Sequence, residues 1–286
     1  MTRIDSHQHF WRYTPQDHPW ISDDMGVLKQ DLLPERLRPS LQRHVIQGTI
    51  LVQARSCANE TRWLLDIAEK TDFVRAVIGW VDLSSQALPK KLEAASHPLL
   101  RGFRHQVQDE PSPAQWLADT AINNGVHQLQ QEEYVYEILV THRHLAEAVQ
   151  FAGRHDNYFL VLDHCGKPDL SLGAAHWKKQ ITPLAALKHV SCKISGLLTE
   201  PRPPGMSPRD LLPYFDAALD IFGSERLMFG SDWPVCLLAG EDENPWAFIE
   251  QATATLSADE QAAIYGGNAH TVYRLQETSN ESASAK

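Results

Sequence analysis

The sequence predicts an α/β fold, a closed (β/α)8 TIM barrel built as one domain. Short apolar or β-branched runs alternate with segments of helical spacing such as 60–70 and 145–154, a pattern typical of parallel βαβ units. Eight such runs are present, the number that closes a barrel rather than an open sheet. The length of 286 residues suits a single barrel, and no linker rich in Pro, Gly and Ser divides the chain.

Each of the eight predicted strands is followed by a polar or helical stretch. A proline-rich loop, 200–208, lies between the last two. Near the C terminus, Ser257 and Glu260 form a capping-box pattern that opens a helix, which we expect to stop at Gly266 and Gly267. We expect the barrel to span residues 1–275 and the polar stretch 276–286 to be a disordered tail. The predicted strands are 3–6, 48–54, 74–82, 100–106, 136–140, 159–163, 189–195 and 226–230.

Composition limits the classes of partner. The formal net charge of −10 disfavours nucleic acid and anionic membranes. There is no apolar signal core at the N terminus and no apolar run long enough to cross a membrane. The four cysteines show no C-x-x-C spacing, which predicts reduced thiols. We therefore expect a soluble, cytoplasmic protein that acts on a small molecule, as a monomer or a homodimer.

Polar residues gather where several predicted strands end, and in a barrel of this kind function belongs to those ends. His7 and His9 are two residues apart at the end of the first strand, so both face the same side. That side would be the barrel axis, which suits a metal ion or a polar ligand. The alternative is a histidine pair on a solvated edge, since the chain has 14 histidines.

Asp232 and His164 end two other strands. The carboxylate of Asp232 follows an apolar run and can face the pocket as a base, or cap the turn that leads to Pro234. His164 begins a loop that also contains Lys167, which resembles a binding loop, although a core histidine is the alternative.

The fourth strand ends in Arg104 and His105. Alternation along a regular strand means that only one of the two can point inward. Arg104 could instead pair with a surface carboxylate such as Asp109 or Glu110. Aromatic rings adjoin two of the proposed site positions, and such rings suit the C–H faces of a sugar; they belong to Trp11 and Trp233.

Five stretches in the same order resemble the lactonase branch of the amidohydrolase superfamily, whose members open sugar-acid lactones of the fuconolactone, rhamnonolactone and galactonolactone type. The resemblance extends from the first strand to the region 268–270 and leaves only the tail outside. The stretches are 4–11, 102–105, 162–168, 192–197 and 228–235.

The resemblance implies an amidohydrolase-like barrel in which water attacks an ester carbonyl. It implies catalytic roles for Asp232 and His164. The expected substrate-binding residues are His7, His9, Trp11, Arg104, His105, Lys167 and Trp233.

One departure from the superfamily concerns metals. Many metal-dependent members carry a histidine at the end of strand five, whereas 136–140 has none. We therefore expect no obligatory cofactor and at most one divalent ion, Zn²⁺, held by His7, His9 and Asp232. Two alternatives stay open: a metal-dependent amidohydrolase or decarboxylase, and a catalytically inactive barrel that binds sugar.

Overall fold

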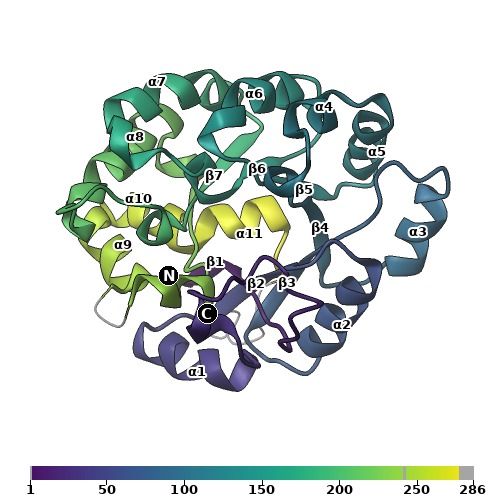
Figure 1. The fold of residues 1–286 in the computed structure, drawn as a ribbon, viewed down its shortest axis with the longest axis horizontal. Coiled ribbons are helices and arrows are strands. Elements are labelled where there is room, and N and C mark those ends of the chain that lie inside the picture. The colour runs from purple at the N-terminus through teal and green to yellow at the C-terminus, as the bar shows by residue number, and fades with distance from the viewer. Residues whose placement is uncertain (1, 241–242, 277–286) are drawn as a thin grey trace, which may run out of the picture.

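A computed structural model describes residues 2–240 and 243–276 of the chain. Its eight strands are parallel and adjacent in chain order, and helices surround them (Figure 1), which confirms the predicted barrel. The ring closes between the ends of the first and last strands, where His9 N donates to Trp233 O at 2.7 Å and Asp232 N donates to His7 O at 2.8 Å. The strands are β1 Ile4–Gln8, β2 Gly48–Val52, β3 Val74–Gly79, β4 Leu100–His105, β5 Val135–Ile138, β6 Leu160–Leu162, β7 Val190–Ile194 and β8 Leu227–Phe229.

The helices follow from apolar positions spaced three and four residues apart. In α2, for example, Leu64, Leu65 and Ala68 are buried against the sheet. Caps mark several starts, such as the Asp119 side chain that accepts from Ala121 N and Ile122 N at the start of α5. The helices are α1 Pro34–Arg43, α2 Ala58–Ala68, α3 Leu88–Ala95, α4 Pro113–Ala118, α5 Thr120–Gln131, α6 Leu145–Gly153, α7 Ala174–Ala185, α8 Leu212–Phe222, α9 Pro245–Thr253, α10 Ala258–Ala262 and α11 Asn268–Tyr273.

The C-terminal helical region differs from its prediction. The capping box of Ser257 and Glu260 is present, and α10 begins there. The helical path does not stop at Gly266 and Gly267 but passes through a π-helical turn, Ala263–Gly267, into α11. Glycine is needed at 266 because an added Cβ would lie 2.1 Å from Thr2 O. The predicted tail from 277 onward lies outside the described residues.

The barrel has two apolar cores. The larger one lies between the strands and the outer helices. The smaller one fills the N-terminal half of the barrel interior, where α11 packs against the strands within the ring (Figure 1). Inward-facing side chains of the strands make up this layer, namely Ile4, Ile50, Val52, Ala76, Ile78, Val135, Val161 and Met228.

Two further features bear on the expectations from composition. None of the helices in 2–240 and 243–276 is long and apolar enough to cross a membrane. The cysteines at 57, 165, 192 and 236 are free thiols.

Candidate active site

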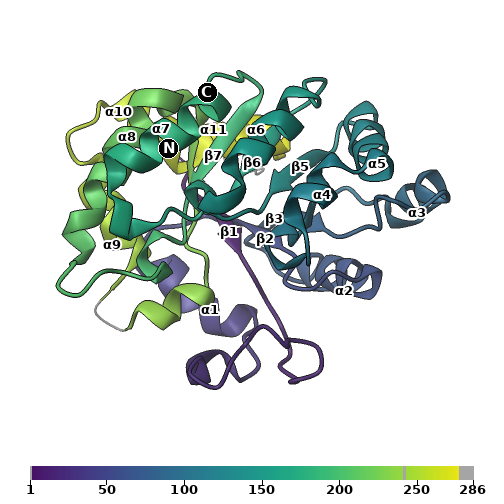
Figure 2. The same ribbon diagram turned by 45° about the horizontal axis from the view of Figure 1, so that its top comes forward.

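A cavity of about 410 Å³ opens at the carboxyl ends of the strands, and the predicted residues His9, Arg104, His164, Lys167 and Asp232 line it. The long segment after β1, which Figure 2 shows extending away from the ring of helices, contributes further lining residues. The volume of the cavity falls within the range of about 300–1,000 Å³ typical of small-molecule sites.

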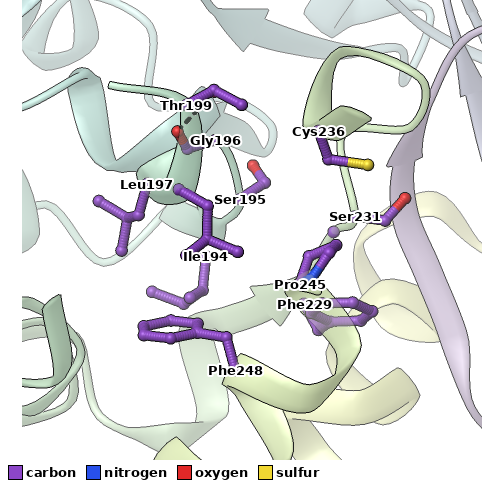
Figure 3. A pocket seen from close by; sticks show the side chains of 12 residues that line it. Ile194, Ser195, Gly196, Leu197, Thr199, Phe229, Ser231, Cys236, Pro245 and Phe248 are labelled. Carbon is purple, nitrogen blue, oxygen red and sulfur yellow. Dashed lines mark hydrogen bonds between the residues drawn. The ribbon is translucent and has the colours of Figure 1, made fainter. Parts of the chain in front are cut away.

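A second, apolar pocket lies next to this cavity, between the end of β7 and β8 (Figure 3). It encloses about 20 Å³, enough for no more than a water molecule. Ser195 and Ser231 lie on its lining, and Ser195 also contacts His164. We interpret this pocket as a packing gap behind the site.

The two histidines at the end of β1, His7 and His9, are buried and point at each other, with 3.2 Å between their Nε2 atoms. His9 Nδ1 lies 2.8 Å from the carbonyl oxygen of Val52. Because a carbonyl only accepts, His9 Nδ1 carries a proton. The other ring nitrogen, His9 Nε2, lies 3.3 Å from Asp232 Oδ1.

The Asp232 backbone adopts a positive φ of 57°, a conformation that concentrates at functional sites in non-glycine residues. Its carboxylate accepts no backbone N–H from the described residues and faces the histidines instead; Oδ2 lies 4.0 Å from His164 Nδ1. Burial raises the pKa of Asp232, but His164, His9 and His7 together outweigh it and hold the pKa below its ordinary range. The group is therefore ionised at neutral pH.

His164 lies in an unusual turn directly after β6. Four consecutive residues have positive φ: His164 at 52°, Cys165 at 53°, Gly166 at 67° and Lys167 at 49°. His164 Nδ1 lies 2.9 Å from Ser195 Oγ, and burial lowers the pKa of His164 to about 4, so the imidazole is neutral at pH 7. The ring fits because position 196 is glycine; a Cβ there would lie 2.9 Å from His164 Nδ1.

Below the histidines lies a buried set of paired charges, of which only Arg104 was among the predicted site residues. Lys193 Nζ contacts Glu137 Oε1 at 2.6 Å and Asp163 Oδ1 at 3.2 Å. Arg104 Nη1 contacts Asp163 Oδ2 at 2.9 Å, and Tyr273 OH donates to Glu137 Oε1 at 2.6 Å. Charged residues inside otherwise apolar strands were the available signal, since such groups are rarely fully buried unless paired.

These charges also act on His7. Lys193 Nζ lies 3.0 Å from His7 Nδ1, and Arg104 Nη1 lies 3.2 Å from His7 Nε2. Burial, followed by the charge of Lys193, lowers the pKa of His7 well below its ordinary value. His7 is therefore neutral and available as a ligand or a hydrogen-bond partner.

Of the pair at the end of β4, Arg104 faces the barrel interior. His105 points outward, where it accepts from Trp80 Nε1 at 2.9 Å, lies 2.7 Å from Glu110 Oε1 and stacks on Trp116. Alternation along the strand therefore allows one inward residue, as expected, and His105 does not line the cavity.

The two tryptophans expected to contact substrate do not line the cavity either. Trp11 donates its indole N–H to Leu28 O at 3.2 Å, and Trp233 packs against Phe10 in the core. Trp20, which was not predicted as a site residue, lines the cavity in their place. Its loop carries no periodic pattern that would have indicated this position.

The donor atoms of His7, His9 and Asp232 suit one metal ion. Their contacts are 3.2 Å between the two Nε2 atoms, and 3.3 Å and 3.8 Å from these to Asp232 Oδ1. Ligands about 2.0–2.1 Å from a tetrahedral zinc lie roughly 3.3 Å apart, so the fit is good. A second candidate group, His7 with Asp163 and His164, shares His7, and its Asp163 is already paired with Arg104 and Lys193. The described residues thus offer a place for one metal ion rather than two.

A barrel with these groups at its carboxyl rim matches a family model described as "Amidohydrolase" over residues 4–275. The chain belongs to this amidohydrolase family. It is 45% identical to an L-fucono-1,5-lactonase of Burkholderia multivorans over 96% of this chain and 97% of the relative. It is 38% identical to an L-fucono-1,5-lactonase of Burkholderia ambifaria over 98% of each chain.

Solved structures agree with this assignment. The chain matches a crystal structure of an amidohydrolase from Burkholderia multivorans with bound zinc, with a TM-score of 0.92 and 44% identity over 96% of this chain and 100% of that one. A second crystal form of that amidohydrolase contains bound HEPES and matches equally well. A putative 2-pyrone-4,6-dicarboxylic acid hydrolase from Pseudomonas putida, at 21% identity and a TM-score of 0.74 over 97% of this chain and 99% of that one, shares the fold.

Proposed function

We propose that the protein hydrolyses the ester bond of a sugar-acid lactone, with L-fucono-1,5-lactone as the reference substrate. The observation that carries this proposal is the ionised Asp232 carboxylate, held beside His9 and His164 on the lining of a cavity of about 410 Å³. The likeness to two L-fucono-1,5-lactonases over nearly the whole chain supports the choice of substrate. The enzyme would act in carbohydrate metabolism. Its cytoplasmic location, and its state as a monomer or homodimer, stay predictions.

In the mechanism that the site supports, Asp232 takes a proton from a water molecule as the water oxygen bonds to the lactone carbonyl carbon. General-base catalysis of this kind contributes about 10²–10⁴-fold. The carbonyl oxygen gains negative charge, and the Arg104 guanidinium, adjacent to His7, stabilises it. Neutral His164, oriented by Ser195, contributes a hydrogen bond.

The bond between the carbonyl carbon and the ring oxygen then breaks. Asp232 returns its proton to the departing ring oxygen, which becomes a hydroxyl group. The product is an open-chain hydroxy acid, which ionises at neutral pH. The sum is one water consumed and no proton left on the enzyme.

His7, His9 and Asp232 are the residues that would hold a zinc ion. When bound there, zinc supplies Lewis-acid polarisation of a carbonyl and a more acidic water. We propose at most one ion per chain and no obligatory metal, because Arg104 already places a positive charge beside His7. Elemental analysis should give no more than one equivalent, and activity should survive chelation. If chelation abolishes activity and zinc restores it, the metal-dependent alternative is favoured.

A panel of sugar lactones followed with a pH indicator tests the proposed function. The purified protein should hydrolyse L-fucono-1,5-lactone well above the spontaneous rate, with L-rhamnono- and galactonolactones as comparison substrates. If no lactone in the panel is hydrolysed faster than in buffer, the proposal is wrong. Binding of a lactone without turnover would instead support the inactive sugar-binding barrel.

A further inference from the structure

The lining of the cavity beside Asp232 has an apolar part and a charged part. Apolar side chains come from the segment after β1 and from the turn after β8, Val235–Ala239, and these two segments include Trp20, Met25, Val235 and Leu238. The loops after β6 and β7 instead contribute two charged groups, Lys167 and Glu200. A ligand in this cavity therefore meets an apolar surface from one pair of loops and opposite charges from another.

Neither charged group is used by the fold. Within 2–240 and 243–276, no hydrogen bond or ion pair involves the Lys167 ammonium or the Glu200 carboxylate. Glu200 is half-buried, and desolvation raises its pKa to about 7, with Lys167 opposing the rise. Both side chains lie partly buried on the cavity lining, so a ligand in the cavity can supply the polar partners that the fold does not.

The backbone fixes Lys167 in a conformation that a lysine rarely adopts. It ends the turn of four positive-φ residues, with φ of 49°, and its carbonyl oxygen accepts from His142 N at 3.2 Å. His142 Nδ1 donates to the same oxygen at 3.1 Å. Strained backbone persists where surrounding contacts hold it, and here the same turn that presents His164 also presents Lys167 to the cavity.

We propose that Lys167 and Glu200 form the subsite that binds the ring hydroxyl groups of the lactone. The ammonium only donates and the carboxylate accepts, so together they complement hydroxyl groups, which do both. The apolar side chains cover the less polar edge of the same ring. This inference rests on the proposed function and extends it, because it makes polyhydroxylation of the ring the property that the enzyme selects.

The test compares two lactones with the same six-membered ester. L-Fucono-1,5-lactone carries ring hydroxyl groups, and δ-valerolactone carries none. For each of Glu200→Gln and Lys167→Met, the ratio of kcat/KM between these lactones should fall about 10- to 100-fold, mainly through KM for the hydroxylated lactone. Glu35→Gln and Lys179→Met change the same residue types at exposed positions and serve as matched controls.

If thermal melting shows folded variants and the ratio of kcat/KM stays within threefold of the wild type, the subsite proposal is overturned while lactone hydrolysis stands. An equal loss on both lactones also overturns it, because it indicates a general effect on the site. If the wild type hydrolyses neither lactone, the proposed function fails and this proposal fails with it.

Discussion

The two halves of the barrel interior are built from the same strands yet differ in chemistry. In the N-terminal half, Val135 of β5 and Val161 of β6 belong to an apolar layer packed against α11. Two residues further along the chain come Glu137, within β5, and Asp163, directly after β6; both are fully buried and paired with Lys193 of β7. Because a step of two residues keeps a side chain on the same face, each strand places stabilising and reactive groups in successive layers.

Pairing of opposite charges allows the charged layer to be buried. Desolvation makes an isolated buried charge very unfavourable, and pairing only offsets this cost. Two carboxylates, Glu137 and Asp163, face two cations, Lys193 and Arg104, so the formal charge of the layer sums to zero. Asp232 lies above this layer, among histidines, as the reactive anion.

The largest expected effect comes from removing the proton acceptor in the C-terminal half of the barrel interior. Asp232→Asn nearly preserves shape but removes the proton acceptor, so kcat/KM for lactone hydrolysis should fall by about 10²–10⁴-fold. The variant should still fold, because the carboxylate accepts no backbone N–H from the described residues, and circular dichroism checks this. A variant that hydrolyses the best lactone near the wild-type rate would contradict the mechanism and favour the turn-capping interpretation.

A second substitution breaks the charge balance. Lys193→Met leaves two buried carboxylates without their shared cation, which should lower the free energy of unfolding by about 3–5 kcal/mol. Ile78→Val, in the apolar layer, should cost only about 0.5–1.5 kcal/mol and serves as the matched control. Urea unfolding of both variants measures the difference.

The double variant Lys193→Met with Glu137→Gln sharpens the result. Removing the charge of Glu137 should recover part of the lost stability, because the remaining carboxylate, Asp163, keeps its contact with Arg104. Equal losses of stability in Lys193→Met and Ile78→Val would show that the charged layer is no more sensitive than the apolar one.

The apolar N-terminal half of the barrel interior can be predicted from the sequence better than the charged layer. Strand interiors are buried on both sides, so apolar runs such as 48–54 stand out, and rim residues such as His7 and Asp232 follow those runs directly. Glu137 and Lys193 are less visible, since a charged residue within a strand is usually taken to face solvent. The two residues lie on β5 and β7, on either side of β6, so their pairing depends on both side chains facing the barrel interior.

The rest depends on register and on loop paths. Alternation indicates that either Arg104 or His105 points inward. The register of β4 and β5 places Arg104 beside Glu137, so Arg104 is the inward residue. Trp20 and Glu200 reach the cavity from loops, where no periodic pattern links a residue to a position in space.

A buried histidine outside the barrel offers the smallest expected effect and isolates burial from charge pairing. His155 is fully buried next to α6, and its Nε2–H donates to Asn123 Oδ1 at 2.9 Å. Its Nδ1 has no partner among the described residues. Burial, with added repulsion from His127, Arg154 and His189, lowers the pKa of His155 to about 3.

The sign of the pH dependence follows from this lowered pKa. Above an unfolded pKa of about 6.5 both states hold a neutral imidazole, so the contribution of His155 to stability is fully present. As the pH falls from 6.5 towards 3, the unfolded state binds a proton that the folded state does not bind, so the free energy of unfolding decreases. The loss stays below about 1.4 kcal/mol per pH unit, the limit for one proton. His155→Gln keeps a donor for Asn123 but does not titrate, so its urea midpoint should fall less steeply between pH 7 and 5 than that of the wild type. Parallel midpoint curves for the two proteins would mean that His155 is protonated as readily in the folded state as in the unfolded one.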